Sequence, residues 1–331
     1  MALRLIQLQT ADGRRILAAR DDDQPAVRLA GVDSVYSLAM NAIDDGISLN
    51  EAVSQRRTTE RIDLRGAANG PRLLAPIDHP DPAHLHLTGT GLTHLGSAES
   101  RDKMHALAAA GGAQTDSMRI FLQGLKGGKP AAGAVGCQPE WFYKGNGFSV
   151  AATNDDLPVP SFALDGGEEP EIAGIYVIDN AGAARRLGFC LANEFSDHVT
   201  ERENYLWLAH SKLRQAALGA ELLTGELPSN VQGSSALLRN GETIWQKPFL
   251  SGEDNMSHTV ANLEHHHFKY DLFRKPGDVH VHFFGCGTLS FADGVKTQAG
   301  DVFEIRADAF LLPLRNRLSM AAPVGFSVQP L

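Results

Sequence analysis

Hydrophobic and polar residues alternate along the first part of the chain with a period typical of strands. Residues 1–70 show this alternation around charged turns at positions 12–13 and 21–23, as expected of short strands joined by tight turns. One stretch, 34–46, instead places its apolar residues at helical spacing and ends on glycine. Residues 66–82 are rich in Gly and Pro. We therefore expect a small N-terminal α/β domain over 1–70, followed by a linker.

The remainder, 71–331, has the pattern of a larger and mostly stranded domain. The expected strands are 84–96, 140–152, 241–250, 277–284, 288–294 and 300–307, and the expected helices are 97–110 and 200–223. Residues 171–178 and 187–192 predict a β-hairpin, and Thr200 with Glu203 three positions later resembles a helix-capping pair. The elements lack the regular strand–helix alternation of a parallel sheet, so we expect a β-rich α+β fold.

The composition excludes several classes of protein. Of 331 residues, 43% are hydrophobic and 21% are charged, which allows a full core. The net charge of -9 disfavours binding to nucleic acid or to an anionic membrane. A local cation or metal ion can still attract an anionic substrate.

The cysteines and the length of the apolar segments indicate in which cellular compartment the protein is found. Cys137, Cys190 and Cys286 are few, odd in number and widely spaced, as expected of free thiols in a reducing environment. The apolar start of the chain is too short for a signal peptide, and no run approaches about 18 apolar residues. We expect a soluble cytoplasmic protein.

The stretch "GGEEPEIAGIYVI", residues 166–178, places acids at the start of an apolar strand. Glu169 and Glu171 point the same way, roughly 6.5–7 Å apart along the strand. The predicted hairpin returns the chain to this point at Glu194. Three carboxylates without matched Cys or His favour a hard ion such as Mg²⁺, Ca²⁺ or Mn²⁺ over Zn²⁺. The alternative is a set of solvated acids at a strand edge, with Glu168 as a further surface charge.

Several motifs occur in an order that resembles the fumarylacetoacetate hydrolase superfamily. They are "LLAPIDHPDPAHLHLTGTGLTHLG", "EEPEIAGIYVI", "LANEFSDH", "HSK" and "KPGDVHVHFFG" followed by "QAGDVFEI", and they span roughly residues 73–316. Within the superfamily the chain looks like the branch of sugar-acid catabolism. The resemblance implies a mixed β-roll with helices packed outside, and a homodimer.

The resemblance also implies a set of functional residues. The family's metal ligands match Glu169, Glu171 and Glu194, and the implied cofactor is Mg²⁺ or Mn²⁺. Many members have Asp at the third position, so Glu194 is one methylene longer here. The family's two lysines match Lys144 and Lys212.

Two positions depart from the family pattern. Ser97 stands where hydrolytic members have a histidine, and His94 is three residues out of register. Because water must be activated by a base for carbon–carbon hydrolysis, this departure disfavours a hydrolase. His94 either replaces that base or is a loop histidine without a role.

His282 replaces the threonine of a family turn and is a candidate contact for a substrate carboxylate. A histidine hydrogen-bonded within the sheet is the alternative. For the run 265–267 of three histidines we expect a solvated helix face or terminus rather than a metal site.

These features give three hypotheses for function. The first is a Mg²⁺-dependent dehydratase of a 2-keto-3-deoxy sugar acid, such as a pentonate, acting through a metal-stabilised enolate. In it Lys212 is the base, with Lys144 as a second base or a positive charge. The second is a hydrolase of a 2,4-diketo acid such as an acylpyruvate, with His94 or a water held by Ser97 as base. The third is a non-catalytic sugar-acid-binding protein that retains only the metal.

Overall fold

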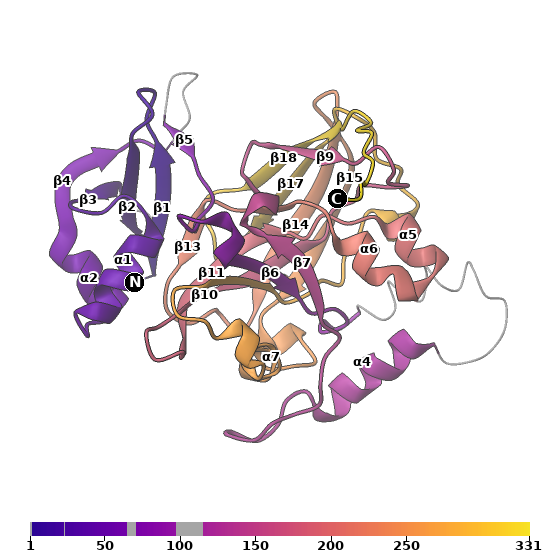
Figure 1. The fold of residues 1–331 in the computed structure, drawn as a ribbon, viewed down its shortest axis with the longest axis horizontal. Helices are drawn as coiled ribbons and strands as arrows, with labels where there is room; N and C mark the ends of the chain where they lie inside the picture. The colour runs from indigo at the N-terminus through magenta and orange to yellow at the C-terminus, as the bar shows by residue number, and fades with distance from the viewer. Residues whose placement is uncertain (1, 23, 65–70, 97–114) are drawn as a thin grey trace.

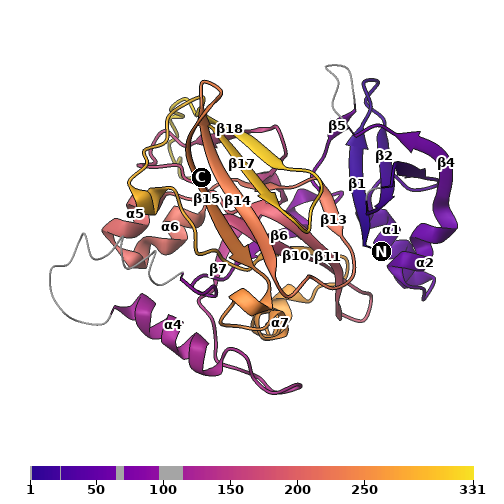
Figure 2. The same cartoon turned by 180° about the vertical axis from the view of Figure 1, so that it is seen from behind.

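The computed structural model describes residues 2–22, 24–64, 71–96 and 115–331, whose strands form two sheets (Figures 1 and 2). Within these residues the larger sheet contains β1 (Leu3–Gln9), β2 (Arg15–Asp21), β3 (Ala26–Leu29), β4 (Arg57–Ile62), β5 (Arg72–Leu73), β6 (Leu85–Gly89), β7 (Phe142–Asn146), β8 (Val150–Ala152), β10 (Pro170–Ile178), β11 (Ala184–Asn193), β12 (Ala216–Leu218), β13 (Glu221–Leu223) and β16 (Val279–Phe283). Its main path runs β4-β3-β2-β1-β13-β11-β10-β16-β6-β7. The smaller sheet, in the order β15-β14-β17-β18-β9, contains β9 (Asp156–Val159), β14 (Val231–Arg239), β15 (Glu242–Ser251), β17 (Val302–Ala307) and β18 (Leu314–Met320).

The helices lie around these sheets. The α-helices are α1 (Val35–Asp44), α2 (Leu49–Arg56), α4 (Asp116–Gly127), α5 (His198–Glu203), α6 (Leu208–Lys212) and α7 (Val260–Phe268). The short 3₁₀ helices are η1 (Pro82–His84), η2 (Gly147–Ser149), η3 (Tyr205–Trp207), η4 (Glu253–Asn255), η5 (Asp271–Phe273) and η6 (Phe291–Asp293). The expected β-rich α+β fold is confirmed. No helix in the described part of the chain is long and apolar enough to cross a membrane.

Strands β10 and β11 occupy the centre of the molecule. Every residue of β10 is buried, because its apolar run faces packed layers on both sides. Ala173 and Ile175 belong to the core beneath α1 and α2. Ile172, on the opposite face, packs in a second core with Phe303 and Ile305 of the smaller sheet. The acidic start of β10 is therefore held in the interior by the packing of the rest of the strand.

The predicted hairpin of β10 and β11 is confirmed. The Asp179 carboxylate closes its turn by accepting hydrogen bonds from the backbone N–H groups of Ala181 and Ala183, at 3.0 and 2.8 Å. A β-bulge interrupts the register opposite Ile175. At the bulge Gly188 has φ +154°, and a Cβ there would lie 2.1 Å from the Leu223 carbonyl oxygen, so this position requires glycine.

The N-terminal elements form a meander that shares the large sheet. Strands β1 to β4 lie beside α1 and α2 at one side of the molecule (Figure 1). Strand β1 pairs with β13, with Leu5 opposite Leu222, and both leucines belong to the same buried core. The division into domains at 70/71 stays a prediction.

The expected helix over 200–223 is wrong. The segment forms α5, η3 and α6 and then turns into β12 and β13. The N-cap of α5 is Asp197 rather than Thr200. Residues of β12 pair with β11 and β8, so tertiary pairing overrides the helical pattern of the apolar residues.

Two other predicted elements, a strand over 288–294 and a helix over 97–110, have different outcomes. The segment 288–294 is a loop with η6 and not a strand. The expected helix 97–110 lies outside the described residues. The three cysteines are free, as expected.

Candidate active site

The three predicted acids meet in the interior. Glu169 directly precedes β10, Glu171 lies on it, and Glu194 directly follows β11. The backbone N–H of Glu194 donates to the Glu169 carbonyl at 3.0 Å, which extends the hairpin ladder to this point. The three residues are only 5%, 2% and 0% exposed. The alternative of solvated acids at a strand edge is therefore wrong.

Both predicted lysines reach the same cluster. Lys144 comes from β7 and Lys212 is the last residue of α6, and both are buried. The Lys212 ammonium donates to Glu169 Oε1 and, at 2.7 Å, to Glu194 Oε2. It also lies 5.1 Å from the ring centre of Phe142. Lys212 thus links two of the carboxylates beside the Phe142 ring.

Lys144 is held by three oxygen atoms. Its ammonium is 2.6 Å from Glu194 Oε1 and donates to the carbonyls of Phe195 and Lys212, at 2.7 and 3.0 Å. Burial lowers the pKa of Lys144, and Glu194 opposes that shift. With all three donors engaged, Lys144 is placed as a fixed partner of Glu194.

Glu171 has the least compensated charge of the three acids. Burial raises its pKa well above the usual value, and the nearby carboxylates of Glu194 and Glu169 raise it further. Its Oε2 accepts a hydrogen bond from the backbone N–H of Gly285 at 2.7 Å. Gly285 has φ +94°, and a Cβ there would lie 2.5 Å from Thr93 Oγ1. The turn at Gly285 thus directs its backbone N–H toward the Glu171 carboxylate.

The Cys286 thiol and two of the carboxylates form one possible set of metal ligands. Atoms of Glu169, Glu171 and Cys286 all lie within 4.8 Å of one another. The two carboxylates offer hard oxygen ligands, while Glu194 uses both of its oxygens to bind the lysines. The three buried carboxylates face two ammonium groups, and His198, between Glu169 and Asp165, adds one cation and one further carboxylate. The acids therefore outnumber the cations by one, which fits a divalent cation.

His198 is a site residue that the sequence analysis missed. It is buried, with Nε2 3.1 Å from Glu169 Oε1 and Nδ1 3.5 Å from Asp165 Oδ2. Burial lowers the pKa of His198, but the interactions with Asp165 and Glu169 outweigh it and raise the pKa to about 10. The Glu169 pKa is raised by burial, yet Lys212 and His198 bring it well below the usual value. A signal was present in the sequence, since His198 follows Glu194 in "NEFSDH".

Glu168 is not the surface charge that we considered. It is buried, and its carboxylate accepts hydrogen bonds from the backbone N–H and the hydroxyl of Ser290, at 2.8 and 2.7 Å. These bonds fix the loop before η6 against the start of β10.

His94 lies close behind Gly285. A Cβ on Gly285 would be 3.6 Å from His94 Nδ1. The ring is buried, with Nδ1 3.1 Å from Thr93 Oγ1 and Nε2 3.0 Å from Ser251 Oγ. Burial lowers the pKa of His94 to about 3. His94 is thus a neutral histidine held by hydroxyls next to the acidic cluster, and its role as a base stays a prediction.

His282 lies away from the acids. Its partner across β10 is Gly174, and strand alternation places its side chain on the face of the sheet opposite to that of Glu171. Its Nδ1 is 2.8 Å from Thr88 Oγ1, and its ring stacks on His267 at 4.6 Å between centres. Contact with a substrate carboxylate stays a prediction for His282. Ser97 lies outside the described residues.

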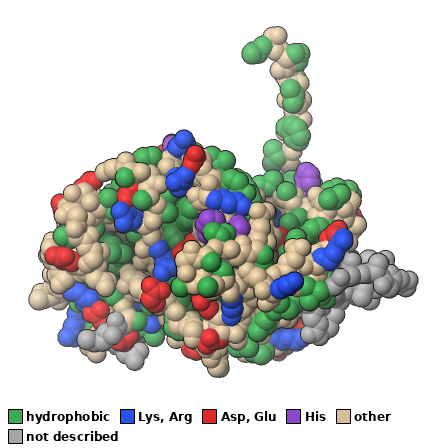
Figure 3. Space-filling model, turned by 90° about the horizontal axis from the view of Figure 1, so that it is seen from below, with side chains coloured by type: hydrophobic (Ala, Val, Ile, Leu, Met, Phe, Trp, Pro, Cys, Tyr) green, Lys and Arg blue, Asp and Glu red, His purple; other side chains and the backbone are tan. Residues whose placement is uncertain are grey.

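The histidine run 265–267 is only partly solvated. His265 is exposed in the last turn of α7, but His266 and His267 are buried. Histidine side chains reach the surface in the middle of the face that carries α7 (Figure 3). The expectation of a solvated face is therefore wrong for two of the three, because α7 turns His267 toward His280 of β16 and His266 toward the Gly136 carbonyl.

A cavity of about 400 Å³ adjoins the site on the side of His198. Its lining includes Asp165, Arg202, Phe291 and Lys296. The Phe291 ring stacks on His198 at 5.2 Å between centres. The buried network of charged side chains around Glu169 therefore extends to the wall of this cavity.

Comparison with solved structures shows which fold this is. A 2-keto-3-deoxy-D-arabinonate dehydratase in its apo form has a TM-score of 0.69 at 17% identity, over 97% of this chain and 100% of that one. Its complex with magnesium and 2,5-dioxopentanoate has a TM-score of 0.68 at 18% identity, over the same shares. The chain has the fold of the fumarylacetoacetate hydrolase superfamily.

Isomerases share this fold. A 5-carboxymethyl-2-hydroxymuconate delta-isomerase from Mycobacterium smegmatis has a TM-score of 0.58 at 18% identity, over 97% of this chain and 100% of that one. No protein-family model and no curated protein matches the sequence. The fold expected from the resemblance is confirmed.

Proposed function

We propose that the protein is a metal-dependent dehydratase of a 2-keto-3-deoxy sugar acid, in particular a pentonate. The observation that carries this proposal is the buried cluster of three glutamates and two lysines on this fold. A structural neighbour at 18% identity is a 2-keto-3-deoxy-D-arabinonate dehydratase complexed with magnesium and 2,5-dioxopentanoate. The structural similarity to that enzyme supports the proposed class of substrate. By itself it does not assign roles to individual residues of this chain.

Glu169, Glu171 and Glu194 would hold the ion, with Glu194 binding it through an oxygen that also contacts Lys144 or Lys212. The fit rests on their oxygen donors and on the uncompensated charge at Glu171. Mg²⁺ or Mn²⁺ suits such a donor set. When bound, the ion supplies positive charge for the carboxylate and keto oxygens of a 2-oxo acid, which makes the C3–H more acidic.

Side chains of the protein then transfer the C3 proton. Lys212 is the proposed base, because its Nζ lies between two ligand carboxylates. In its neutral amine form it can take the proton from C3 and deliver it to the leaving C4 hydroxyl. The C3–H and C4–O bonds break, a C3=C4 double bond forms, and the proton and the hydroxide leave together as water. A proton then moves from C5 to C3, and the resulting C4=C5 enol tautomerises to the C5 aldehyde. Lys144 keeps Glu194 in place, and His198 orients Glu169.

The alternative is a hydrolase that cleaves a carbon–carbon bond in a 2,4-diketo acid. The observation in its favour is that His94 lies directly behind Gly285, which binds Glu171. Against it, both ring nitrogens of His94 already lie within hydrogen-bond distance of hydroxyls. A base for water would have to give up one of these contacts.

One set of assays distinguishes the dehydratase from the hydrolase. Metal-stripped protein is reloaded with Mg²⁺ or Mn²⁺ and incubated with each stereoisomer of 2-keto-3-deoxypentonate, while aldehyde release is followed with a coupled aldehyde dehydrogenase. We expect metal-dependent release of a semialdehyde 2-oxo acid. Acylpyruvates serve in parallel, with pyruvate as the readout. Fast pyruvate release without turnover of any pentonate would reject the dehydratase.

A further inference from the structure

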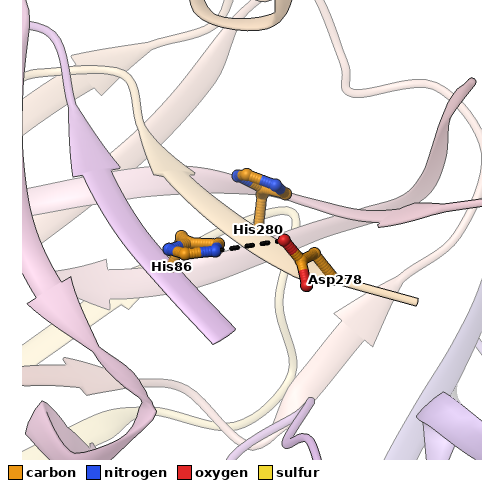
Figure 4. Close-up of side chains that lie close together, drawn as sticks. All are labelled: His86, Asp278 and His280. Atoms are coloured by element: carbon orange, nitrogen blue, oxygen red, sulfur yellow. Dashed lines mark hydrogen bonds and ion pairs between the residues drawn. The ribbon is translucent and has the colours of Figure 1, made fainter. Parts of the chain in front are cut away.

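Outside the acidic cluster, charged side chains also gather at β6 and β16 and around the cavity beside His198. At the two strands, His86, Asp278 and His280 lie close together (Figure 4). Both oxygens of Asp278 are bonded there, one to His84 Nδ1 at 2.7 Å and one to His86 Nε2 at 3.3 Å. This group is therefore bonded internally and offers no free carboxylate to a ligand. The cavity differs, because its charged side chains are basic.

Two basic side chains line the cavity. Arg202 lies on α5, four residues after His198, and Lys296 lies on the loop after η6. Arg202 is half-buried, with its guanidinium carbon 5.1 Å from the centre of the Phe291 ring, and Lys296 is exposed. Neither forms a salt bridge with a residue that the structure describes. Within the described residues, no carboxylate therefore compensates these two positive charges.

Asp165 is the acid on the cavity wall, but its charge is paired elsewhere. Its Oδ2 lies 3.5 Å from Nδ1 of His198, whose other ring nitrogen contacts Glu169 at 3.1 Å. These two acids raise the pKa of His198 to about 10, so the imidazole is a cation at neutral pH. The pair of Asp165 and His198 is neutral as a whole, and Arg202 and Lys296 leave the cavity with a positive excess. In a chain with a net charge of -9, such a local excess favours an anionic ligand at this place.

The rest of the wall is largely apolar. It is formed by side chains that include Leu164, Val199, Phe291 and Val295. The Phe291 ring stacks on His198 and also contacts the guanidinium of Arg202, so the aromatic side chain positions this cation at the wall. A volume of about 400 Å³ lies in the range of small-molecule sites. The cavity thus suits a ligand with a charged end and a small organic group.

We propose that this cavity binds a small phosphate monoester. Arg202 and Lys296 hold the phosphate, which carries about -1.5 to -2 charges at pH 7 and so matches two cations. A single carboxylate would leave one of the two cations unpaired. The apolar side chains face the organic group. The site is separate from the proposed activity, because none of the three glutamates and two lysines of the acidic cluster lines the cavity.

Isothermal titration calorimetry of metal-stripped protein compares glycerol 3-phosphate with glycerate, which carries a carboxylate in place of the phosphate. We expect one glycerol 3-phosphate per chain, and binding of glycerate that is weaker by about 10-fold or more. Arg202→Gln and Lys296→Gln should each weaken the binding of glycerol 3-phosphate by about 10-fold or more, the usual effect of losing one charge-assisted hydrogen bond.

Three control variants should keep the affinity for glycerol 3-phosphate. Lys269→Gln and Arg119→Gln remove exposed cations of the same two types elsewhere, and Lys212→Met removes a cation of the acidic cluster. Far-UV circular dichroism checks folding, and Lys296→Gln, at an exposed position, serves as the test if Arg202→Gln disturbs α5. The proposal would be overturned by absence of binding to wild type, by equal binding to the folded Arg202→Gln and Lys296→Gln variants, by equally tight binding of glycerate, or by loss of binding in Lys212→Met.

Discussion

The ammonium group of Lys212 is where the buried charges of the candidate active site meet. It donates to Glu169 and Glu194 at once, while Lys144 takes the other oxygen of Glu194. Such a network is stable only as a whole, because removal of one partner leaves another buried charge uncompensated. Roles of single residues are therefore best tested against exposed residues of the same type.

We predict that Lys212→Met lowers kcat with a 2-keto-3-deoxypentonate by about two to four orders of magnitude, the usual contribution of a general base. Lys269→Met is the control, since Lys269 is an exposed lysine at the end of α7. Steady-state kinetics on both variants, with circular dichroism for folding, provide the measurement. Unchanged kcat in Lys212→Met would remove this lysine from the mechanism.

Glu171→Gln should separate stability from metal binding. The raised pKa of Glu171 means that the folded, metal-free protein holds its proton above the pH at which the unfolded chain releases it. The stability from this group is present at low pH and is lost as the pH rises through the folded pKa. At pH 7 the glutamine variant without metal should melt higher, by on the order of 2 °C.

With Mg²⁺ added, the wild type should gain in melting temperature and Glu171→Gln should not. Glu203→Gln, at an exposed position of α5, should behave as wild type. Differential scanning fluorimetry with and without Mg²⁺ measures both effects. An equal Mg²⁺ shift in the two glutamine variants would exclude Glu171 as a ligand.

At the scale of elements, the segment from α5 to α6 positions Lys212. Asp197 is fully buried at its start and caps α5 by accepting a hydrogen bond from the Thr200 N–H at 3.0 Å. Its Oδ2 accepts from the Leu164 N–H and from Arg214 Nη2, at 3.0 and 3.1 Å. One carboxylate thus joins the loop before β10 to both ends of the segment.

We predict that Asp197→Ala lowers the free energy of unfolding by about 3–5 kcal/mol, because Arg214 loses its buried partner. Thr115→Ala removes a different cap, that of α4, and should cost only about 1 kcal/mol. Urea unfolding of the two variants gives the comparison. Equal losses would show that Asp197 acts as a cap alone.

At the scale of the whole molecule, buried neutral histidines should make stability depend on pH. Burial lowers the pKa of His94 and of His282 to about 3 and that of His258 to about 4. The unfolded chain takes up these protons near its ordinary pKa of about 6.5. Stability is therefore full above about pH 6.5 and is lost as the pH falls, by about 1.4 kcal/mol per pH unit for each histidine.

His282→Asn should reduce this acid slope by about one histidine's share, whereas His265→Asn, at an exposed position, should leave it unchanged. Urea unfolding between pH 4.5 and 7.5 measures the slopes, and identical slopes in all three proteins would contradict the prediction. His198 acts in the opposite sense. With its pKa raised to about 10, its contribution is present below about pH 6.5 and is lost toward pH 10.

The sequence by itself determined what depends on neighbours along the chain. The spacing of Glu169 and Glu171 fixes their common direction, but the sequence left open whether the pair lies in the interior or at a solvated strand edge. The ordered motifs then indicated the fold and led to Lys144 and Lys212. The hairpin was predictable because its two strands and its turn are contiguous.

Only the tertiary structure decided the contacts between distant segments. The break of the 200–223 helix follows from pairing of β12 with β11 and β8, which no local pattern encodes. His198 joins the acids through packing of a loop against Asp165. His86 and His280 are 194 positions apart and meet only because β6 and β16 pair in parallel. Local periodicity fixes the direction of a side chain, whereas strand pairing and the packing of two cores fix what it faces.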